Sequence, residues 1–332
     1  MVTLLEVRNL SVGIRRNNEY LPVLNGIDFD IAADEIVGLA GESGCGKSLT
    51  ALSISRLLPP AAGITGGSIR FNTGVLDRAV YCDMLSLDEV ELCRIRGRDI
   101  SMIFQEPRQS LNPLIRIGAQ IIETLRLHGL RDGKQARAAA LDIIGKLGLA
   151  EPEKIFNAYP HQLSGGMCQR VMIAIATICR PKLLIADEPT TALDQTTQNQ
   201  ILALLEQINR DFGVSILFIS HDLSAVRRFC RRFLVMYAGR IVEEGSTETL
   251  FSSPAHPYTR GLIGAIPNRE HRGRPLVNIS GRTPSIEDRF SGCSFAPRCP
   301  QALEKCLEAF PLETDLGDGH RVRCVMAGAG YD

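Results

Sequence analysis

The segment that most constrains the fold is GESGCGKS, which runs from Gly41 to Ser48. It matches the phosphate-binding loop pattern GxxxxGK[ST], in which glycines let consecutive backbone N–H groups curve around phosphate oxygens. The apolar run EIVGLA precedes it, and SLTALSISRLL follows it. We therefore predict a strand at 35–40 and a helix beginning at Ser48, whose positive dipole end points at the nucleotide. The alternative, a glycine-rich turn with an accidental lysine, is disfavoured by this order of strand, loop and helix.

Within this loop, Lys47 is expected to reach the β- and γ-phosphates, and the Ser48 hydroxyl to bind Mg²⁺. The residues predicted to bind the nucleotide here are Gly41, Glu42, Ser43, Gly44, Cys45, Gly46, Lys47, Ser48 and Leu49.

Length and charge exclude several classes of protein. The 332 residues exceed one ordinary compact domain and indicate a large α/β core with an appended piece. The 37 basic and 37 acidic side chains balance, so we expect no nucleic acid partner. The N-terminus MVTLLEVRN has no signal-peptide pattern, and the longest apolar stretch, 171–186, is broken by Arg180, Pro181 and Lys182. We therefore expect a cytosolic chain, in which ten cysteines argue against a disulfide framework.

Apolar patterning predicts the order of the elements along the chain. Leu4–Val12 and Leu24–Ile31 are predicted as strands of a small β-lobe, followed by strands at Gly67–Phe71 and Asp99–Phe104. From 108 to 180 the apolar residues recur at three- and four-residue spacing, which indicates a helical insertion. The runs LLIADEP and VSILFIS then return as continuous apolar strands, typical of a parallel sheet covered on both faces.

A second chemical site is predicted where one of these strands ends. LLIADE places two adjacent carboxylates, Asp187 and Glu188, at the carboxyl edge of the sheet, where ligands of such folds bind. We assign Mg²⁺ binding to Asp187 and polarisation of the attacking water to Glu188. An ordinary strand ending in a solvated acidic pair is the alternative, which the phosphate loop in the same chain disfavours.

The segment LSGGM, Leu163–Met167, precedes the helical run QRVMIAIATICR. Here the chain resembles the ATP-binding subunits of ABC transporters, whose signature LSGGQ packs against ATP held by a partner subunit. The resemblance implies ATP and Mg²⁺ as cofactors and assigns nucleotide contacts to Ser164, Gly165, Gly166 and Met167. Met167 departs from the usual Gln, as it commonly does in the peptide and nickel importers of this family. Ser164 is also expected to cap the helix, which any flexible helix entry would explain.

The other elements of this family follow in order. Gln105 matches the Q-loop glutamine that contacts Mg²⁺, the attacking water and the membrane subunits. Asp194, at the end of TTALD, matches the D-loop at the dimer interface, and His221 of SHD matches the switch histidine that contacts the γ-phosphate. Glu188, His221 and Gln105 are thus the expected catalytic residues. The aromatic residue that usually stacks on adenine is replaced by Ile14, with Tyr20 as a possible substitute.

Three segments resemble the peptide and nickel importer branch of the family: QEPRQSLNPL, YPHQLSGGM and SPAHPYTRGLIGAIP (Ser253–Pro267). The resemblance implies an ATPase that powers import of di- or oligopeptides, with nickel or metal-chelate import as the alternative. A soluble ABC ATPase outside transport is disfavoured, because the chain holds one cassette and no basic insertion. The implied partners are two transmembrane permease subunits, a second and related ATPase subunit and, indirectly, an extracytoplasmic substrate-binding protein. The implied location is the cytoplasmic face of the cell inner membrane.

The last part of the chain gathers four of the ten cysteines, Cys293, Cys299, Cys306 and Cys324. Four thiolates suit a structural Zn²⁺ or an iron–sulfur cluster, and their spacing, unlike the paired CxxC of zinc ribbons, favours a [4Fe–4S] cluster over Zn²⁺. Unligated thiols are the remaining alternative. The segment also resembles the C-terminal extension of oligopeptide and dipeptide permease ATPases, which implies a cluster there. We expect a structural role for it, far from the phosphate loop.

The predicted fold is α/β, with a P-loop NTPase core of ABC ATPase type, an N-terminal antiparallel β-lobe, an inserted α-helical subdomain and a small Cys-rich extension. The expected domains are 1–250, with the helical subdomain at 108–180, and 251–332, the extension with the four-cysteine site.

Overall fold

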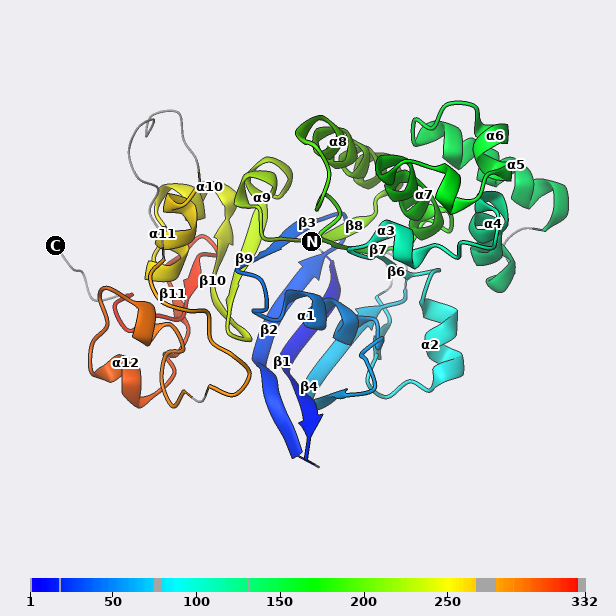
Figure 1. Cartoon of the computed structure of the whole chain (residues 1–332). Helices are drawn as coiled ribbons and strands as arrows, with labels where there is room; N and C mark the ends of the chain where they lie inside the picture. The colour runs from blue at the N-terminus through cyan, green and yellow to red at the C-terminus, as the bar shows by residue number, and fades with distance from the viewer. Residues whose placement is uncertain are drawn as a thin grey trace. The chain divides into compact units, whose positions relative to one another are not determined.

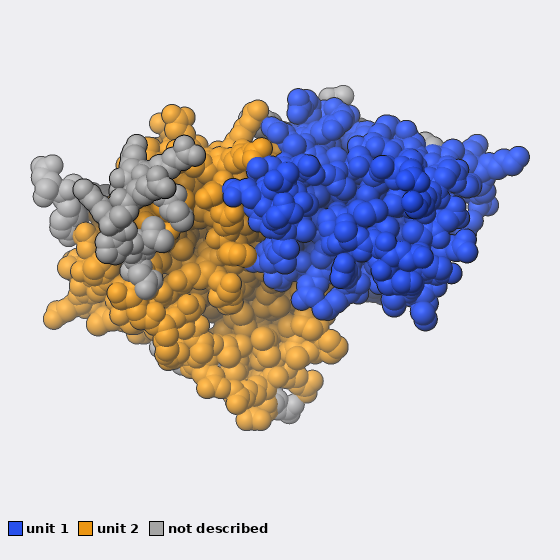
Figure 2. All heavy atoms as spheres, turned by 45° about the horizontal axis from the view of Figure 1, so that its top comes forward, with its two compact units in different colours: residues 1–5, 31–35, 71–217 blue, residues 6–30, 36–70, 218–332 orange. Residues whose placement is uncertain are grey.

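The computed structural model describes residues 2–17, 19–74, 79–129, 132–266, 279–288 and 290–327. The chain divides into two compact units, coloured blue and orange in Figure 2. Unit 1 comprises residues 1–5, 31–35 and 71–217, and unit 2 comprises residues 6–30, 36–70 and 218–332. Pro267, the last residue of the predicted importer segment, lies outside the described residues.

Unit 2 holds most of the N-terminal antiparallel β-lobe, whose long strands are blue in Figure 1. β1 (Thr3–Arg16), β2 (Glu19–Ala32) and β4 (Ala62–Asn72) lie side by side in the order β2, β1, β4. All three contain the predicted strands and extend beyond them. β1 and β2 extend into the polar loop between them, where exposed side chains continue a hairpin that apolar patterning alone does not indicate. β4 begins five residues earlier than predicted.

The parallel core of unit 2 is built on β3 (Ile36–Ala40), which leads into the phosphate loop. β3 pairs in parallel with β9 (Arg232–Tyr237), and β9 pairs antiparallel with β10 (Arg240–Ser246). β10 in turn pairs antiparallel with β12 (Arg321–Val322), and β12 with β11 (Thr314–Asp315). The C-terminal extension thus continues the same sheet that carries the phosphate loop.

The helices of unit 2 include the one that follows the phosphate loop. They are α1 (Lys47–Ile54), α9 (Leu223–Phe229), α10 (Thr247–Ser252), α11 (Pro257–Gly264), η3 (Ala296–Arg298) and α12 (Lys305–Glu308). α1 is shorter than the predicted segment, which ran to Leu58. Arg56 adopts a left-handed conformation (φ 54°) and Pro59 follows, so the helix ends at Ile54.

Unit 1 carries the predicted helical segment between two parallel strands, β6 (Ile100–Ile103) and β7 (Leu183–Asp187). Its helices, mostly green in Figure 1, are α2 (Glu89–Ile95), α3 (Pro107–Ser110), α4 (Ile117–Leu127), α5 (Gly133–Lys146), α6 (Pro152–Asn157), η1 (Pro160–Gln162), α7 (Gly165–Thr177) and α8 (Gln195–Phe212). A short strand, β5 (Tyr81–Asp83), precedes them. The boundary between the units falls within β8 (Ser215–Ser220).

A buried carboxylate anchors the HPYT segment to β10. Glu243 accepts hydrogen bonds from the N–H groups of Ala255 (2.6 Å) and His256 (3.0 Å) and pairs with His320 Nε2 at 2.8 Å. His256 is itself 1% exposed, and its Nδ1 accepts from Tyr258 N at 3.0 Å, which caps α11. Burial, together with the charge of Arg260, lowers the pKa of His256 to about 3. The imidazole is therefore neutral at physiological pH, with its proton on Nε2.

This buried histidine predicts a loss of stability in acid. The unfolded chain protonates His256 near pH 6.5, whereas the folded chain does so only near 3, so stability is full above 6.5 and falls as the pH drops toward 3. His256→Asn keeps a helix cap that does not titrate. Between pH 7 and 4.5, wild type is expected to lose roughly 2–3 kcal/mol more unfolding free energy than the variant. Urea unfolding at both pH values measures this, and equal losses contradict the assignment.

Candidate functional site

The phosphate loop is held against β9 so closely that its first glycine cannot be replaced. A Cβ on Gly41 would lie 2.2 Å from the carbonyl oxygen of Met236. Gly46 has φ 112°, and a Cβ there would lie 2.6 Å from a methyl of Leu24. On the other side of the loop, the N–H of Gly239 donates to the Cys45 carbonyl at 2.8 Å. Strand packing and the β9–β10 turn thus set the path of this backbone.

Lys47 lies at the start of α1 with its ammonium folded into the loop. Its Nζ donates to the carbonyl oxygens of Gly41 (2.9 Å) and Glu42 (3.0 Å), so the charge stays within the curve of backbone that would hold phosphates. Cys45 is buried beside it, and burial raises the pKa of its thiol despite the nearby lysine. The loop therefore carries no thiolate that would repel an anionic ligand. Ser48 follows in the first turn of α1.

The paired carboxylates at the end of β7 differ in backbone conformation. Asp187 is the last strand residue, while Glu188 follows in a left-handed conformation with φ 48°. The Glu188 side chain is buried and its Oε2 accepts from Gln105 Nε2 at 3.0 Å and from the Thr191 hydroxyl at 2.9 Å. The structure therefore brings together two of the predicted catalytic residues, Gln105 and Glu188.

The predicted signature and D-loop residues each begin a helix. Ser164 caps α7, its hydroxyl accepting from the N–H of Met167 at 3.3 Å, so Gly165, Gly166 and Met167 form the first turn. Asp194 caps α8 and accepts from Thr197 N at 3.0 Å and from its hydroxyl at 2.6 Å. These hydrogen bonds hold the pKa of Asp194 below its usual value. Both sites present backbone N–H groups of a helix start, a geometry suited to anions.

Three further predicted positions lie in unit 2. His221 follows directly after β8 and is exposed. Tyr20 is half exposed, and its ring lies against Gly63 and Gly13 of the β-lobe. Ile14, near the end of β1, is half-buried. The loop residues Gly41–Leu49 and His221 belong to unit 2. The other predicted site residues belong to unit 1: Gln105, Asp187, Glu188, Asp194 and the signature segment.

The sequence did not predict two partners of the phosphate loop. The hydroxyl of Tyr258 accepts from the N–H of Glu42 at 2.9 Å, and Arg298 pairs with the Glu42 carboxylate at 2.7 Å. The C-terminal extension therefore contacts the loop through Tyr258 and Arg298, although the four-cysteine site within it was expected to lie far from the loop. Both partners lie more than two hundred positions from Glu42 in sequence, and no short motif links residues so far apart.

A phosphate loop between strand and helix, with a buried carboxylate pair after a parallel strand, defines the chain as a P-loop ATPase. Residues 24–191 match the ABC transporter family, and residues 242–306 match the Oligopeptide/dipeptide transporter, C-terminal region. The chain belongs to the ABC transporter family, as an ATP-binding subunit of the oligopeptide/dipeptide type. The membership and the activity predicted from the sequence, ATP hydrolysis coupled to transport, are confirmed.

Relatives extend over nearly the whole chain. The oligopeptide transport ATP-binding protein AppD of Bacillus subtilis is 46% identical over 98% of this chain and 97% of its own length. The dipeptide transport protein DppD of the same organism is 42% identical, covering 98% and 95%. Oligopeptide transport protein OppD of Escherichia coli is 44% identical, covering 93% and 89%.

The fold is also that of a solved cassette. The dimeric, post-hydrolysis structure of the ATP-binding cassette MJ0796 with ADP and Pi has a TM-score of 0.64 and 28% identity, and the match covers 74% of this chain and 99% of that one. The predicted fold, an ABC-type P-loop core with an antiparallel β-lobe and a helical subdomain, is thereby confirmed.

The geometry at β7 predicts the effect of changing Glu188. Glu188→Gln keeps the size of the side chain and an oxygen that accepts from Gln105, but removes the carboxylate that would orient and polarise water. We expect kcat for ATP hydrolysis to fall at least about 100-fold, while the Kd for ATP changes less than about threefold because the phosphate loop is intact. Steady-state ATPase assays and nucleotide titration measure both.

The matched control is Glu206→Gln, which makes the same change on the exposed face of α8 and should leave kcat unaltered. Near-normal turnover in Glu188→Gln would remove Glu188 from the catalytic set.

Proposed function

We propose that this chain hydrolyses ATP to power the import of di- or oligopeptides through an ABC transporter. The observation that carries the proposal is the joining, in one chain, of the ATPase core with the C-terminal region of oligopeptide and dipeptide transporters at 242–306. The relatives named for oligopeptide and dipeptide transport support it, because they match along nearly all of their own length. Domains at 1–250 and 251–332, with helices at 108–180 as a subdomain, complete the proposed organisation.

The proposed partners are two transmembrane permease subunits and a second, related ATPase subunit, at the cytoplasmic face of the cell inner membrane. The substrate-binding protein would act on this chain only through the permeases. The dimeric state of cassette MJ0796 supports a paired arrangement. None of the helices in the described residues has the length and apolar character needed to span a bilayer.

In the proposed mechanism, the chain's residues position ATP between two subunits. The backbone of Gly41–Leu49 and the Lys47 ammonium bind the phosphates, and the partner's copy of the signature segment closes over them. Ser48, Gln105 and Asp187 carry oxygen atoms of the kind that Mg²⁺ prefers and would be the residues that hold the ion, which when bound supplies positive charge beside the phosphates. Glu188 would orient the attacking water, and His221 would contact the γ-phosphate. Asp194 presents the start of α8 at the interface between subunits.

Peptide uptake tests the function directly. Lys47→Ala removes the ammonium that would bind the phosphates, so ATP affinity and uptake of labelled peptide by vesicles carrying the whole transporter should both fall at least about tenfold. Lys134→Ala, at the exposed start of α5, is the matched control. Parallel uptake assays with ⁶³Ni²⁺ separate the cargo classes, and uptake of nickel without peptide would replace the proposed cargo.

We propose further that Cys293, Cys299, Cys306 and Cys324 bind one [4Fe–4S] cluster. The four thiols have the donor chemistry of such a cluster. The N–H of Cys293 donates to the Cys306 carbonyl at 2.7 Å, and Cys306 and Cys324 contribute to raising the pKa of both other thiols. Burial is the larger cause, and it raises the pKa of Cys293 to about 11. All ten cysteines are free thiols. Among the residues that the structure describes, no group of three or more His, Cys, Asp or Glu side chains is placed to hold a metal ion.

The cysteine proposal predicts that the four thiols act as one unit. Anaerobically purified protein should contain about four irons per chain and absorb broadly in the visible range. Replacing any one of the four with Ser should remove most of the iron, because a four-ligand site loses geometry and charge balance together. Cys179→Ser, in the core, is the control and should keep the iron. If the protein contains zinc instead of iron, the metal assignment changes. If undamaged protein contains neither iron nor zinc, the metal site is refuted.

A further inference from the structure

The C-terminal extension places one buried arginine on the phosphate loop. Arg298 forms a two-pronged ion pair with Glu42, with Nη1 2.7 Å from Oε2 and Nη2 3.0 Å from Oε1. The arginine side chain is 6% exposed and the glutamate side chain 24%. The hydrogen bonds to Glu42 raise the pKa of Arg298 above its usual value. A pair so well shielded from water is not one of the exposed ion pairs that contribute little.

The N–H, the carbonyl and the carboxylate of Glu42 each form a hydrogen bond. Its carboxylate binds Arg298, its N–H donates to the hydroxyl of buried Tyr258 at 2.9 Å, and its carbonyl accepts from Lys47 Nζ at 3.0 Å. Thr283, also from the extension, donates to the same carboxylate at 3.4 Å. Movement of Glu42 would therefore also shift the carbonyl that orients the Lys47 ammonium.

Arg298 is itself fixed by a turn between two cysteines. It ends η3, in which the N–H of Arg298 donates to the Phe295 carbonyl at 2.9 Å and the N–H of Cys299 to Ala296 at 3.2 Å. The guanidinium also donates to the carbonyl of Ser280 (2.9 Å) and the hydroxyl of Tyr237 (3.3 Å). Five donors in a rigid plane thus connect the extension, β9 and the loop.

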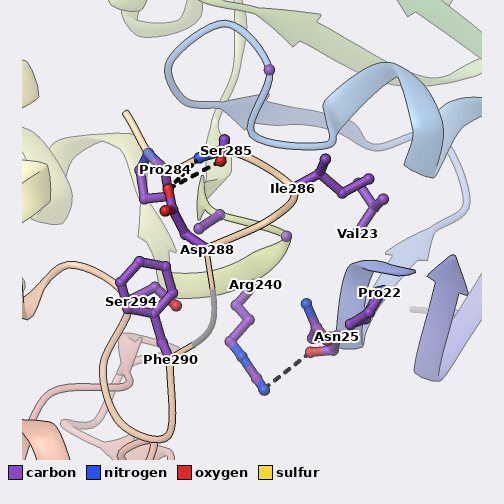
Figure 3. Close-up of a pocket in the computed structure, with 13 residues that line it drawn as sticks. Pro22, Val23, Asn25, Arg240, Pro284, Ser285, Ile286, Asp288, Phe290 and Ser294 are labelled. Atoms are coloured by element: carbon purple, nitrogen blue, oxygen red, sulfur yellow. Dashed lines mark hydrogen bonds between the residues drawn. The ribbon is translucent and has the colours of Figure 1, made fainter. Parts of the chain in front are cut away.

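A neighbouring cavity lies along the same contact between extension and loop. It has a volume of about 150 Å³ and is lined by Gly44 of the loop, by the β9–β10 turn and by the extension at Pro284, Ile286 and Ser294 (Figure 3). Asp288 accepts from both the N–H and the hydroxyl of Ser285, so this stretch of the extension is ordered by its own hydrogen bonds. The loop therefore meets the extension at Gly44 as well as at Glu42.

We propose that Arg298 is a positioning residue of the ATPase, which neutralises Glu42 and fixes the phosphate loop for ATP. Without the guanidinium, a poorly hydrated carboxylate would remain on a loop that must accept a polyanion. Because Arg298 acts through Glu42, its loss affects nucleotide binding rather than the chemical step. The inference depends on the ATPase activity of the family and is independent of the cargo and of any metal at the cysteines.

The test compares ATP affinity and turnover in the purified full-length chain. Arg298→Met keeps much of the side-chain volume but removes the charge, so Kd and KM for Mg²⁺–ATP should rise about tenfold while kcat stays within about twofold. Arg298→Lys should recover part of the affinity, because it restores the charge without the fork. The control is Arg282→Met, since Arg282 pairs with Asp288 within the extension, and its affinity should equal that of wild type.

A double-mutant cycle separates positioning from general stability. In a Glu42→Gln background no carboxylate is left to neutralise, so Arg298→Met should change KM less than about twofold. An equal rise in both backgrounds, or no rise in either, overturns the proposal. If thermal unfolding shows that Arg298→Met does not fold, the same cycle is run with Arg298→Lys, and absence of coupling between Arg298→Lys and Glu42→Gln overturns it equally.

Discussion

The site depends on one close backbone approach, that of Gly41 to the carbonyl of Met236 on β9. Any side chain at this position would push the loop off the strand, and the N–H groups that curve around phosphate would lose their common centre. The β9–β10 turn reinforces the approach, since the N–H of Gly239 binds the Cys45 carbonyl and a Cβ on Gly239 would lie 1.7 Å from the Val23 carbonyl. The phosphate loop is thus shaped by its neighbours as much as by its own glycines.

Much of the fold could be predicted because buried parallel strands are continuous apolar runs. β3, β7 and β8 lie where such runs were found, and β7 ends at the carboxylates that suggested a site. Helix ends and short helices were harder to predict. α1 ends early at a left-handed Arg56, and α2 was missed although Asp88 and Glu91 form a reciprocal capping box that the sequence displays.

The candidate site divides in the same way between local and distant features. Lys47, Ser164 and Asp194 could be assigned because each belongs to a short motif whose spacing determines its local geometry. The pairing of Glu42 with Arg298 could not be predicted, because the two positions are 256 residues apart and the local sequence around Arg298, APRCP at 296–300, does not indicate it. Such a pair follows from tertiary packing, which places η3 beside the loop.

The extension is attached to the core at two places. The conformational order of the extension therefore affects the phosphate loop. At one end β12 pairs with β10, where buried Glu244 binds both Arg232 and Arg321 and Glu243 binds His320. At the other end Arg298 holds Glu42. A segment this small has too little core to be stable alone. Because each attachment holds the residues between them in place, loosening one raises the conformational entropy that the other must overcome. Weakening the β12 end is thus transmitted to Glu42 without any change in the loop's own sequence.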